Sequence, residues 1–196
     1  MILGGVLVTG CASAATQQAG AVTLPPAARV TNPPGPAASR STSQAFTSDL
    51  YGFELVLPSP WQLQRASTAW ASGVLEGRCP SDWDCFSDST EARTLAVAAI
   101  DVPQNTTLRE WQAEIHASAP AGVKDSDPPS EATLDSQPAL AWTAASVDEG
   151  LNVIKLVALH GTRAYAALFA SPMSASLAAD QAAFDAIIGT FKFTAR

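Results

Sequence analysis

The chain has 196 residues and a formal net charge of −7, from 18 acidic and 11 basic side chains. All 18 acidic residues follow position 45, and this acidity argues against nucleic-acid binding, which depends on a basic surface. No apolar run is long enough to cross a bilayer as a helix of the mature protein. We therefore expect neither nucleic acid as a partner nor a membrane-spanning helix.

Cys11 follows Val8-Thr9-Gly10 and closes a short apolar run, residues 1–10. This arrangement is similar to a bacterial lipobox, in which a cysteine after small residues is acylated and becomes the new N-terminus. Each buried CH₂ of the attached chains adds about 0.8 kcal/mol of membrane affinity. We expect residues 1–10 to be a signal peptide and the lipid on Cys11 to hold the protein on the outer face of the bacterial cytoplasmic membrane. The alternative is a buried N-terminal strand with an incidental cysteine.

The apolar run lacks a preceding Lys or Arg, which is consistent with a translation start upstream of Met1. Residues 11–45 are rich in Ala, Pro, Ser and Thr and contain no Asp or Glu. Their Pro-Pro pairs interrupt both helices and strand ladders, so we expect a disordered tether with an end-to-end distance of roughly 30 Å. Residues 46–196 are long enough for one domain with its own core.

Hydrophobic periodicity in 46–196 alternates between strand and helix patterns. Thr107 with Glu110 predicts a capping box at the start of the first helix, and Gly189 predicts the end of the second. Strands in meander order with inserted helices predict an α+β fold, an antiparallel sheet covered by helices. The predicted elements are strands at 53–57, 61–65, 70–75 and 95–100, a helix at 107–115, strands at 131–135, 139–145, 151–159 and 163–170, a helix at 174–188 and a strand at 190–194.

Cys79 and Cys85 are separated by five residues. In an exported protein two nearby cysteines usually pair, so we predict a disulfide, whose loop of about seven residues contributes roughly 2 kcal/mol. Trp83 lies inside this acidic loop. An exposed tryptophan on a rigid loop is a common recognition anchor. The alternative is that Trp83 folds back onto the domain.

Catalytic patterns are missing from the sequence. There is no Gly-x-Ser-x-Gly nucleophile turn, no glycine-rich phosphate loop, and no cluster of His, Cys, Asp or Glu at metal-ligand spacing. The histidines, His116 and His160, have ordinary explanations near a helix C-terminus and in a hairpin turn. We expect no metal, no cofactor and no enzymatic activity.

Three motifs together carry a resemblance to a known family. Tyr51-Gly52-Phe53 precedes Pro58 and Trp61, a strand pair turns at Gly161 before Arg163-Ala164-Tyr165, and the final helix leads to Phe191-Lys192-Phe193. Their order resembles the PsbP-like family, which includes the LpqN-type lipoproteins of actinobacteria. The resemblance implies an α/β/α sandwich over most of residues 46–196 and a non-enzymatic accessory or assembly role. It implies no catalytic residue.

Two functional hypotheses follow. The first is a non-catalytic interaction or assembly module that docks on an envelope protein while lipid on Cys11 anchors it. The second is a carrier that holds a small molecule or lipid in a cavity between sheet and helices, lined by Trp70, Trp111 and Trp142. Core packing is the alternative explanation for these three tryptophans.

Overall fold

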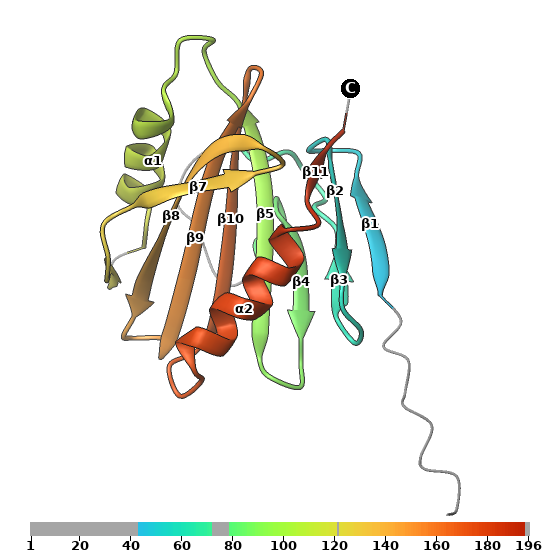
Figure 1. Ribbon diagram of the computed structural model, residues 1–196, viewed down its shortest axis with the longest axis vertical. Coiled ribbons are helices and arrows are strands. Elements are labelled where there is room, and N and C mark those ends of the chain that lie inside the picture. The colour runs from blue at the N-terminus through green and yellow to red at the C-terminus, as the bar shows by residue number, and fades with distance from the viewer. Residues whose placement is uncertain (1–42, 72–78, 121, 195–196) are drawn as a thin grey trace, which may run out of the picture. The chain divides into compact units, whose positions relative to one another are not determined.

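The computed structural model describes residues 43–71, 79–120 and 122–194, and Figure 1 shows how their strands and helices are arranged. The larger sheet contains β3 (Gln62–Gln64), β4 (Asp84–Asp88), β5 (Arg93–Asp101), β6 (Val123–Asp125), β7 (Ser130–Leu134), β8 (Gln137–Ser146), β9 (Leu151–His160) and β10 (Arg163–Pro172). The smaller sheet contains β1 (Gln44–Ser48), β2 (Phe53–Leu57) and β11 (Lys192–Phe193), and the helices are α1 (Leu108–Ala117) and α2 (Leu177–Ile188).

The larger sheet has eight strands in the order β3-β4-β5-β10-β9-β8-β6, with β7 paired to β8 beside this path. All the strand pairs of the described residues are antiparallel. The predicted α+β class, an antiparallel sheet covered by helices, is therefore confirmed. Neither described helix is long and apolar enough to span a membrane.

Three strands were not predicted. β1 begins at Gln44, within the segment predicted as tether, and β6 lies between the predicted helix at 107–115 and the predicted strand at 131–135, where no strand was expected. β4 replaces the expected loop around Cys85, because Asp84 and Asp88 are buried and hydrogen-bonded rather than solvated. Trp70 and Ala71 lie outside any strand, and the rest of the strand predicted at 70–75 lies outside the described residues.

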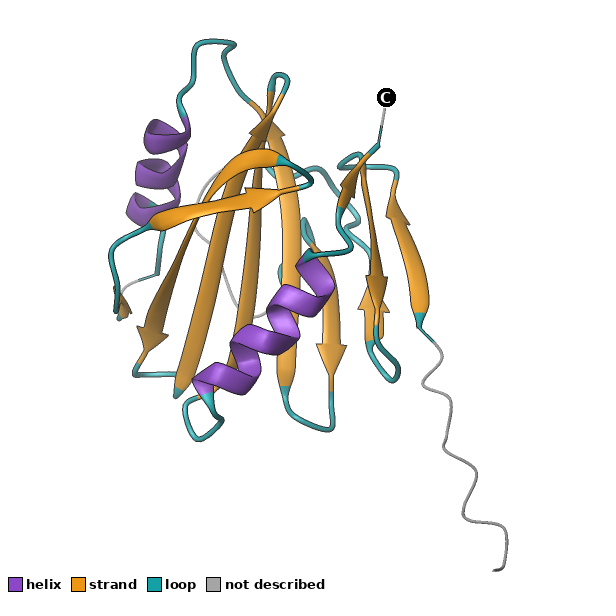
Figure 2. Ribbon diagram, viewed as in Figure 1, coloured by secondary structure: helices purple, strands orange, loops and turns teal. Residues whose placement is uncertain are grey.

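The two helices lie on opposite faces of the larger sheet, as Figures 1 and 2 show for α2 in front and α1 behind. Alternation along β9 assigns side chains to these faces. Leu156 lines a groove together with residues of α2. Lys155 points to the other face, where it pairs with Asp125, and Asp125 also contacts His116 of α1. We call these the α2 face and the α1 face.

The α2 face carries the aromatic core. Phe46 of β1 meets Phe86 of β4 at a ring separation of 4.9 Å, and Phe169 of β10 meets Phe184 of α2 at 5.8 Å. The smaller sheet and α2 therefore cover this face together. A buried ion pair also fastens α2, because Asp180 lies 2.8 Å from Arg93 Nε and accepts a hydrogen bond from Ser171 Oγ at 2.6 Å.

The helix ends agree with the predicted signals. Thr107 caps α1, where its hydroxyl accepts from the backbone N–H of Glu110 and the Glu110 carboxylate accepts from the backbone N–H of Thr107, so the predicted capping box is confirmed. Gly189 is the C-cap of α2, also as predicted. The inner side of α1 is formed by Trp111 and Ile115, both buried against the sheet.

Candidate binding groove

A groove of about 410 Å³ lies between α2 and the hairpin formed by β7 and β8, and we call it the α2 groove. Its volume falls within the range of ligand pockets in proteins. The floor is apolar and comes from both sheet and helix, while the rim carries polar and charged side chains. The floor includes Ala141, Leu156, Phe184 and Ile188, and the rim includes Thr133, Asp135, Gln181, Asp185 and Lys192.

The path of β7 creates this groove. Asp135 and Ser136 form the two-residue turn of the β7–β8 hairpin, and both have positive φ, 46° and 65°, as a type I′ turn requires. The turn therefore begins one residue before the gap between the strands predicted at 131–135 and 139–145. The first half of β8 pairs with β7 on one side and β9 on the other. Figure 2 shows β7 crossing in front of the larger sheet on the same side as α2.

The β7–β8 turn is hydrogen-bonded to β11. Asp135 accepts a hydrogen bond from Lys192 Nζ at 2.6 Å and another from the backbone N–H of Phe193 at 2.9 Å. The hydrogen bond from Lys192, the backbone N–H and the positive charge of Lys192 together hold the pKa of Asp135 below its usual range. This pairing neutralises one carboxylate of the rim and connects the hairpin to β11.

The second rim carboxylate is not neutralised. Asp185 accepts a hydrogen bond from Gln181 Nε2 at 2.8 Å along the exposed side of α2, and it forms no ion pair with any residue that the structure describes. The α2 groove therefore combines an apolar floor with an excess negative charge at its helical wall. Such a site suits an occupant that is apolar on one side and cationic on the other.

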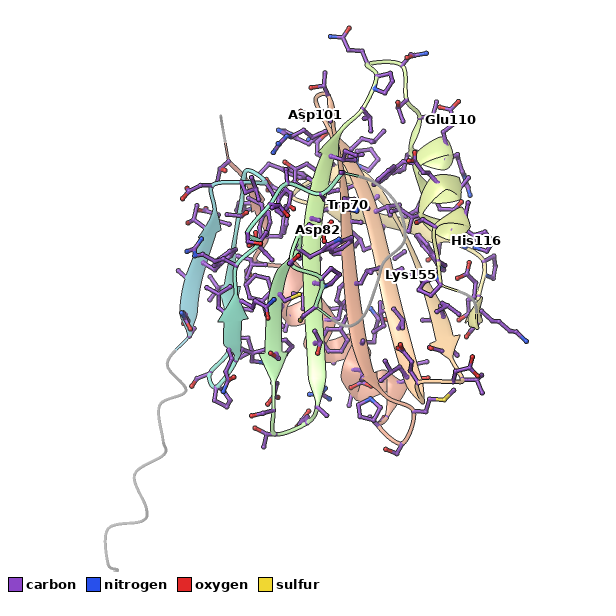
Figure 3. The ribbon with its side chains drawn as sticks, turned by 180° about the vertical axis from the view of Figure 1, so that it is seen from behind. Trp70, Asp82, Asp101, Glu110, His116 and Lys155 are labelled. Carbon is purple, nitrogen blue, oxygen red and sulfur yellow. The ribbon has the colours of Figure 1, made fainter. Side chains whose placement is uncertain are left out.

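The α1 face holds a different group of charges. Lys155 is only 3% exposed, and its Nζ lies 3.1 Å from Asp125, which is also 2.7 Å from Nδ1 of His116 on α1. Figure 3 shows Lys155 and His116 on this side of the sheet. Burial opposes ionisation of Asp125, but the hydrogen bond and charge of Lys155 and the hydrogen bond of His116 outweigh it and lower its pKa.

Trp142 lies beside this group. The Lys155 ammonium is 5.5 Å from the centre of its ring, within the range of a cation–π contact. The buried indole N–H of Trp142 faces the Asp125 carboxylate without completing a hydrogen bond of normal geometry. These contacts join α1, β6, β8 and β9 on the α1 face, and the sequence analysis did not predict them.

Trp70, Trp83 and Trp111 pack together. The ring centre of Trp70 lies 4.8 Å from that of Trp83 and 5.6 Å from that of Trp111. Trp83 is 1% exposed, so the interpretation of Trp83 as an exposed recognition anchor is wrong, and the alternative that it folds back is correct. Trp83 directly precedes β4, and the Asp84 carboxylate accepts a hydrogen bond from the backbone N–H of Ala66, so Trp83 packs beside the segment that carries Trp70.

Hydrogen bonds hold this tryptophan cluster in place. The Trp111 Nε1–H donates to the backbone carbonyl of Tyr165 at 2.9 Å, and the Tyr51 hydroxyl accepts from the Trp70 backbone N–H at 3.0 Å and donates to the Asp82 carbonyl. Burial raises the pKa of Tyr51 to about 12. Trp70, Trp111 and Trp142 do not line the α2 groove, so this groove is not the cavity that the sequence analysis predicted.

The predicted disulfide is not present. The sulfur atoms of Cys79 and Cys85 are not at bonding distance, and a hydrogen bond joins the two side chains. The hydrogen bond from Cys85 lowers the pKa of Cys79, whereas the same contact and burial raise the pKa of Cys85. The short separation of the two residues in the sequence brings their side chains into contact, and β4 pairs with β5 so that Cys85 lies opposite Ala96.

Two other predicted features concern ligands and lipid. Within the ranges that the structure describes, no group of three or more His, Cys, Asp or Glu side chains could hold a metal ion. Cys11 and most of the predicted tether lie outside the described residues.

Comparison with known proteins gives the fold a context. No protein-family model and no curated protein matches the chain. The solution structure of cyanobacterial PsbP (CyanoP) from Synechocystis sp. PCC 6803 matches with a TM-score of 0.52 and 14% identity, over 83% of this chain and 98% of that one. LpqN of Mycobacterium tuberculosis, described as involved in cell envelope biogenesis, matches with a TM-score of 0.51 and 14% identity, over 80% of this chain and 92% of that one.

A third solved structure, from Bacteroides thetaiotaomicron VPI-5482, has a TM-score of 0.49 and 14% identity, and the match covers 78% of this chain. It covers 48% of that chain, so this chain spans about half of its length. The similarity to CyanoP and LpqN shows that the described domain has a PsbP-like fold, as the sequence motifs predicted.

Proposed function

We propose that this protein is a non-catalytic binding module of the bacterial cell envelope, and that the α2 groove is the surface with which it engages an envelope protein. The observation that carries the proposal is the groove itself, with its apolar floor and at its wall the charge of Asp185, which forms no ion pair within the described part of the chain. Apolar surface with a few polar groups at the rim is typical of recognition sites. LpqN, which shares the fold, is described as involved in envelope biogenesis.

The location is the second part of the proposal. Lipid on Cys11 anchors the chain to the outer face of the cytoplasmic membrane, and the Pro-rich segment after it sets the domain off from the lipid surface. Metabolic labelling with a palmitate analogue tests the anchor. We expect label in the wild-type protein and none in Cys11→Ser. An unlabelled wild type would refute the anchor and leave the groove to be tested separately.

Site-specific photo-crosslinking in cells tests the groove. A photoreactive residue in place of Gln181, at the groove wall, is expected to capture one defined envelope protein in high yield. The matched control is the same residue in place of Val147, which is exposed in the β8–β9 turn and does not line the groove. Equal yields from the two positions would contradict the groove as the binding surface.

A carrier of a small molecule is the second candidate, and the volume of the α2 groove favours it. Native mass spectrometry of the protein purified from its own cells distinguishes the two functions. A carrier is expected to retain a defined small ligand that Phe184→Trp, which fills the groove floor, displaces. A protein that carries no ligand but gives the Gln181 crosslink supports the interaction module.

A further inference from the structure

We propose that the α2 groove binds an extended, basic segment of a partner protein, which adds to the free edge of β7 as a further strand. The inference rests on the proposed function and gives the partner segment a conformation and a charge. Addition of a strand to an exposed sheet edge is a recurrent mode of peptide recognition, in which main-chain hydrogen bonds supply affinity and neighbouring pockets supply specificity.

β7 is an edge strand. Among the described strands it pairs only with β8, from Ser130 opposite Ala141 to Leu134 opposite Gln137. In a two-residue type I′ hairpin the residues flanking the turn form a hydrogen-bonded pair, and such pairs then alternate along the ladder. The backbone groups of Leu134, Ala132 and Ser130 therefore point toward β8.

The register leaves the backbone groups of Glu131 and Thr133 on the other edge. Thr133 lies opposite Pro138, which has no N–H to donate, so this position also fits a pair without cross-strand hydrogen bonds. Neither residue makes a turn or loop backbone hydrogen bond with any described residue. Two N–H donors and two carbonyl acceptors therefore remain available on the outer edge of β7.

This free edge opens into the α2 groove. Ala132 and Thr133 are consecutive residues whose side chains point to opposite faces of the strand, yet both line the groove. The strand must therefore present its edge, rather than one face, to the groove. The opposite wall is α2, and the floor between them is formed by Ala141 and Leu156. A strand laid along β7 would place alternate side chains on this apolar floor.

The carboxylates at the α2 groove favour a positively charged segment as its occupant. Lys192 neutralises Asp135 at the turn, whereas Asp185 on the helical wall has no cationic partner among the described residues. Glu131 adds an exposed carboxylate to β7, and the whole chain carries a net charge of −7. An acidic segment would be repelled at both walls, so the groove favours a segment that alternates basic and apolar residues.

The test uses three synthetic hexapeptides with blocked ends and the full-length protein. The first repeats Lys-Val three times, the second has Glu in place of Lys, and the third is the Lys-Val peptide methylated on every backbone nitrogen. Binding is measured by calorimetry, and the backbone amide signals of Glu131 and Thr133 are followed by NMR. We expect the Lys-Val peptide to shift these two amide signals and the other two peptides to bind at least about tenfold more weakly.

Variants test the same contacts from the protein side. Thr133→Pro removes an edge N–H without removing a β7–β8 hydrogen bond, and it should weaken the Lys-Val peptide at least about tenfold, whereas Thr133→Val should leave binding unchanged. Asp185→Lys should weaken it to a similar degree, whereas Asp148→Lys, outside the groove, should not. Asp185→Lys keeps the inference testable if Thr133→Pro does not fold.

Three outcomes would overturn the strand-addition inference. They are equal binding of the methylated peptide, Lys-Val binding that both Thr133→Pro and Asp185→Lys leave intact, and absence of Lys-Val binding up to about 1 mM. Each of these leaves the proposed function standing if the Gln181 crosslink still forms. Conversely, Lys-Val binding that meets every criterion, in a protein that gives no Gln181 crosslink in cells, supports the strand site and contradicts the proposed envelope partner.

Discussion

The two faces of the larger sheet use charge differently. On the α2 face, Asp180 of α2 forms a buried pair with Arg93 of the sheet, while Asp185 lies at the groove on the exposed side of the same helix. On the α1 face, Lys155 and Asp125 are directed inward and join the sheet to α1 through His116. Because Asp180 already fixes α2, Asp185 is not needed to hold the helix. The α2 face therefore keeps the charges that fasten its helix apart from the groove charges that we propose contact a partner, whereas the α1 face uses its charges to fasten α1.

Removal of the Arg93–Asp180 ion pair on the α2 face should cause the largest loss of stability. Asp180→Ala leaves Arg93 without its buried partner and removes the acceptor for Ser171. Breaking such a pair from one side typically costs about 3–5 kcal/mol. We expect a loss of this size in the free energy of unfolding, measured by urea denaturation.

Asp185→Ala on the same helix is the matched control, with an expected change within about 0.5 kcal/mol. Arg93 also contacts Glu91 at the surface. A loss below about 1 kcal/mol in Asp180→Ala would show that Glu91 replaces Asp180 as the partner of Arg93. The carboxylate on the buried side of α2 would then matter no more to stability than Asp185 on its exposed side.

The charges of the α1 face should contribute less to the free energy of unfolding than the Arg93–Asp180 pair does, and their contribution should depend on pH. Asp125→Asn removes the only countercharge that the described residues place on the buried Lys155 ammonium. The loss should be about 2 kcal/mol at pH 7, below that of Asp180→Ala, because Asp125 is 20% exposed and partly screened. Asp101→Asn is the control, since Asp101 is 79% exposed beside Arg163 and should change stability by less than about 0.5 kcal/mol.

The pH dependence has a definite sign. The folded state lowers the pKa of Asp125, so its contribution to stability is present above the unfolded pKa of about 3.9 and is lost as the pH falls through the lower folded value. We expect the wild type to lose stability over this range more steeply than Asp125→Asn does. Parallel curves of unfolding free energy against pH would contradict an attachment through the charge of Asp125.

Local signals in the sequence were sufficient for much of the fold. The capping residues, the alternation in β2 and the long apolar runs of β9 and β10 are properties of neighbouring residues, and each predicted its element. β4 was missed because its buried carboxylates resemble a solvated loop until their partners are known. Asp84 is hydrogen-bonded to Ser48 of β1, and no local pattern predicts a contact over that separation.

The candidate site depended even more on distant contacts. Lys155 in the middle of an apolar strand is a readable sign of a buried ion pair, because lysine is rarely buried unpaired. Its partner Asp125 ends β6, 30 residues earlier and just before a Pro-rich loop, where the sequence offers several carboxylates. The α2 groove arises from the course of the β7–β8 hairpin toward α2. Trp70, Trp111 and Trp142 were predicted to line a cavity because they are large and apolar. The groove is instead lined mainly by small, aliphatic and polar side chains, which no sequence pattern distinguishes from other surface or core residues.

The smallest expected effect on stability concerns the Lys192–Asp135 ion pair in the rim of the groove. Lys192→Met removes the partner of Asp135, and exposed ion pairs contribute between about 0 and 1 kcal/mol, so the free energy of unfolding should fall by less than about 1 kcal/mol. The pKa of Asp135, followed by NMR, should rise toward its ordinary value because the hydrogen bond and charge of Lys192 are lost. The same variant adds a second unpaired carboxylate to the groove, so the Lys-Val peptide should bind more tightly. Tighter binding at nearly constant stability would confirm that the rim of the α2 face recognises a cationic partner, whereas a large loss of stability would show that this rim, like the α1 face, serves attachment.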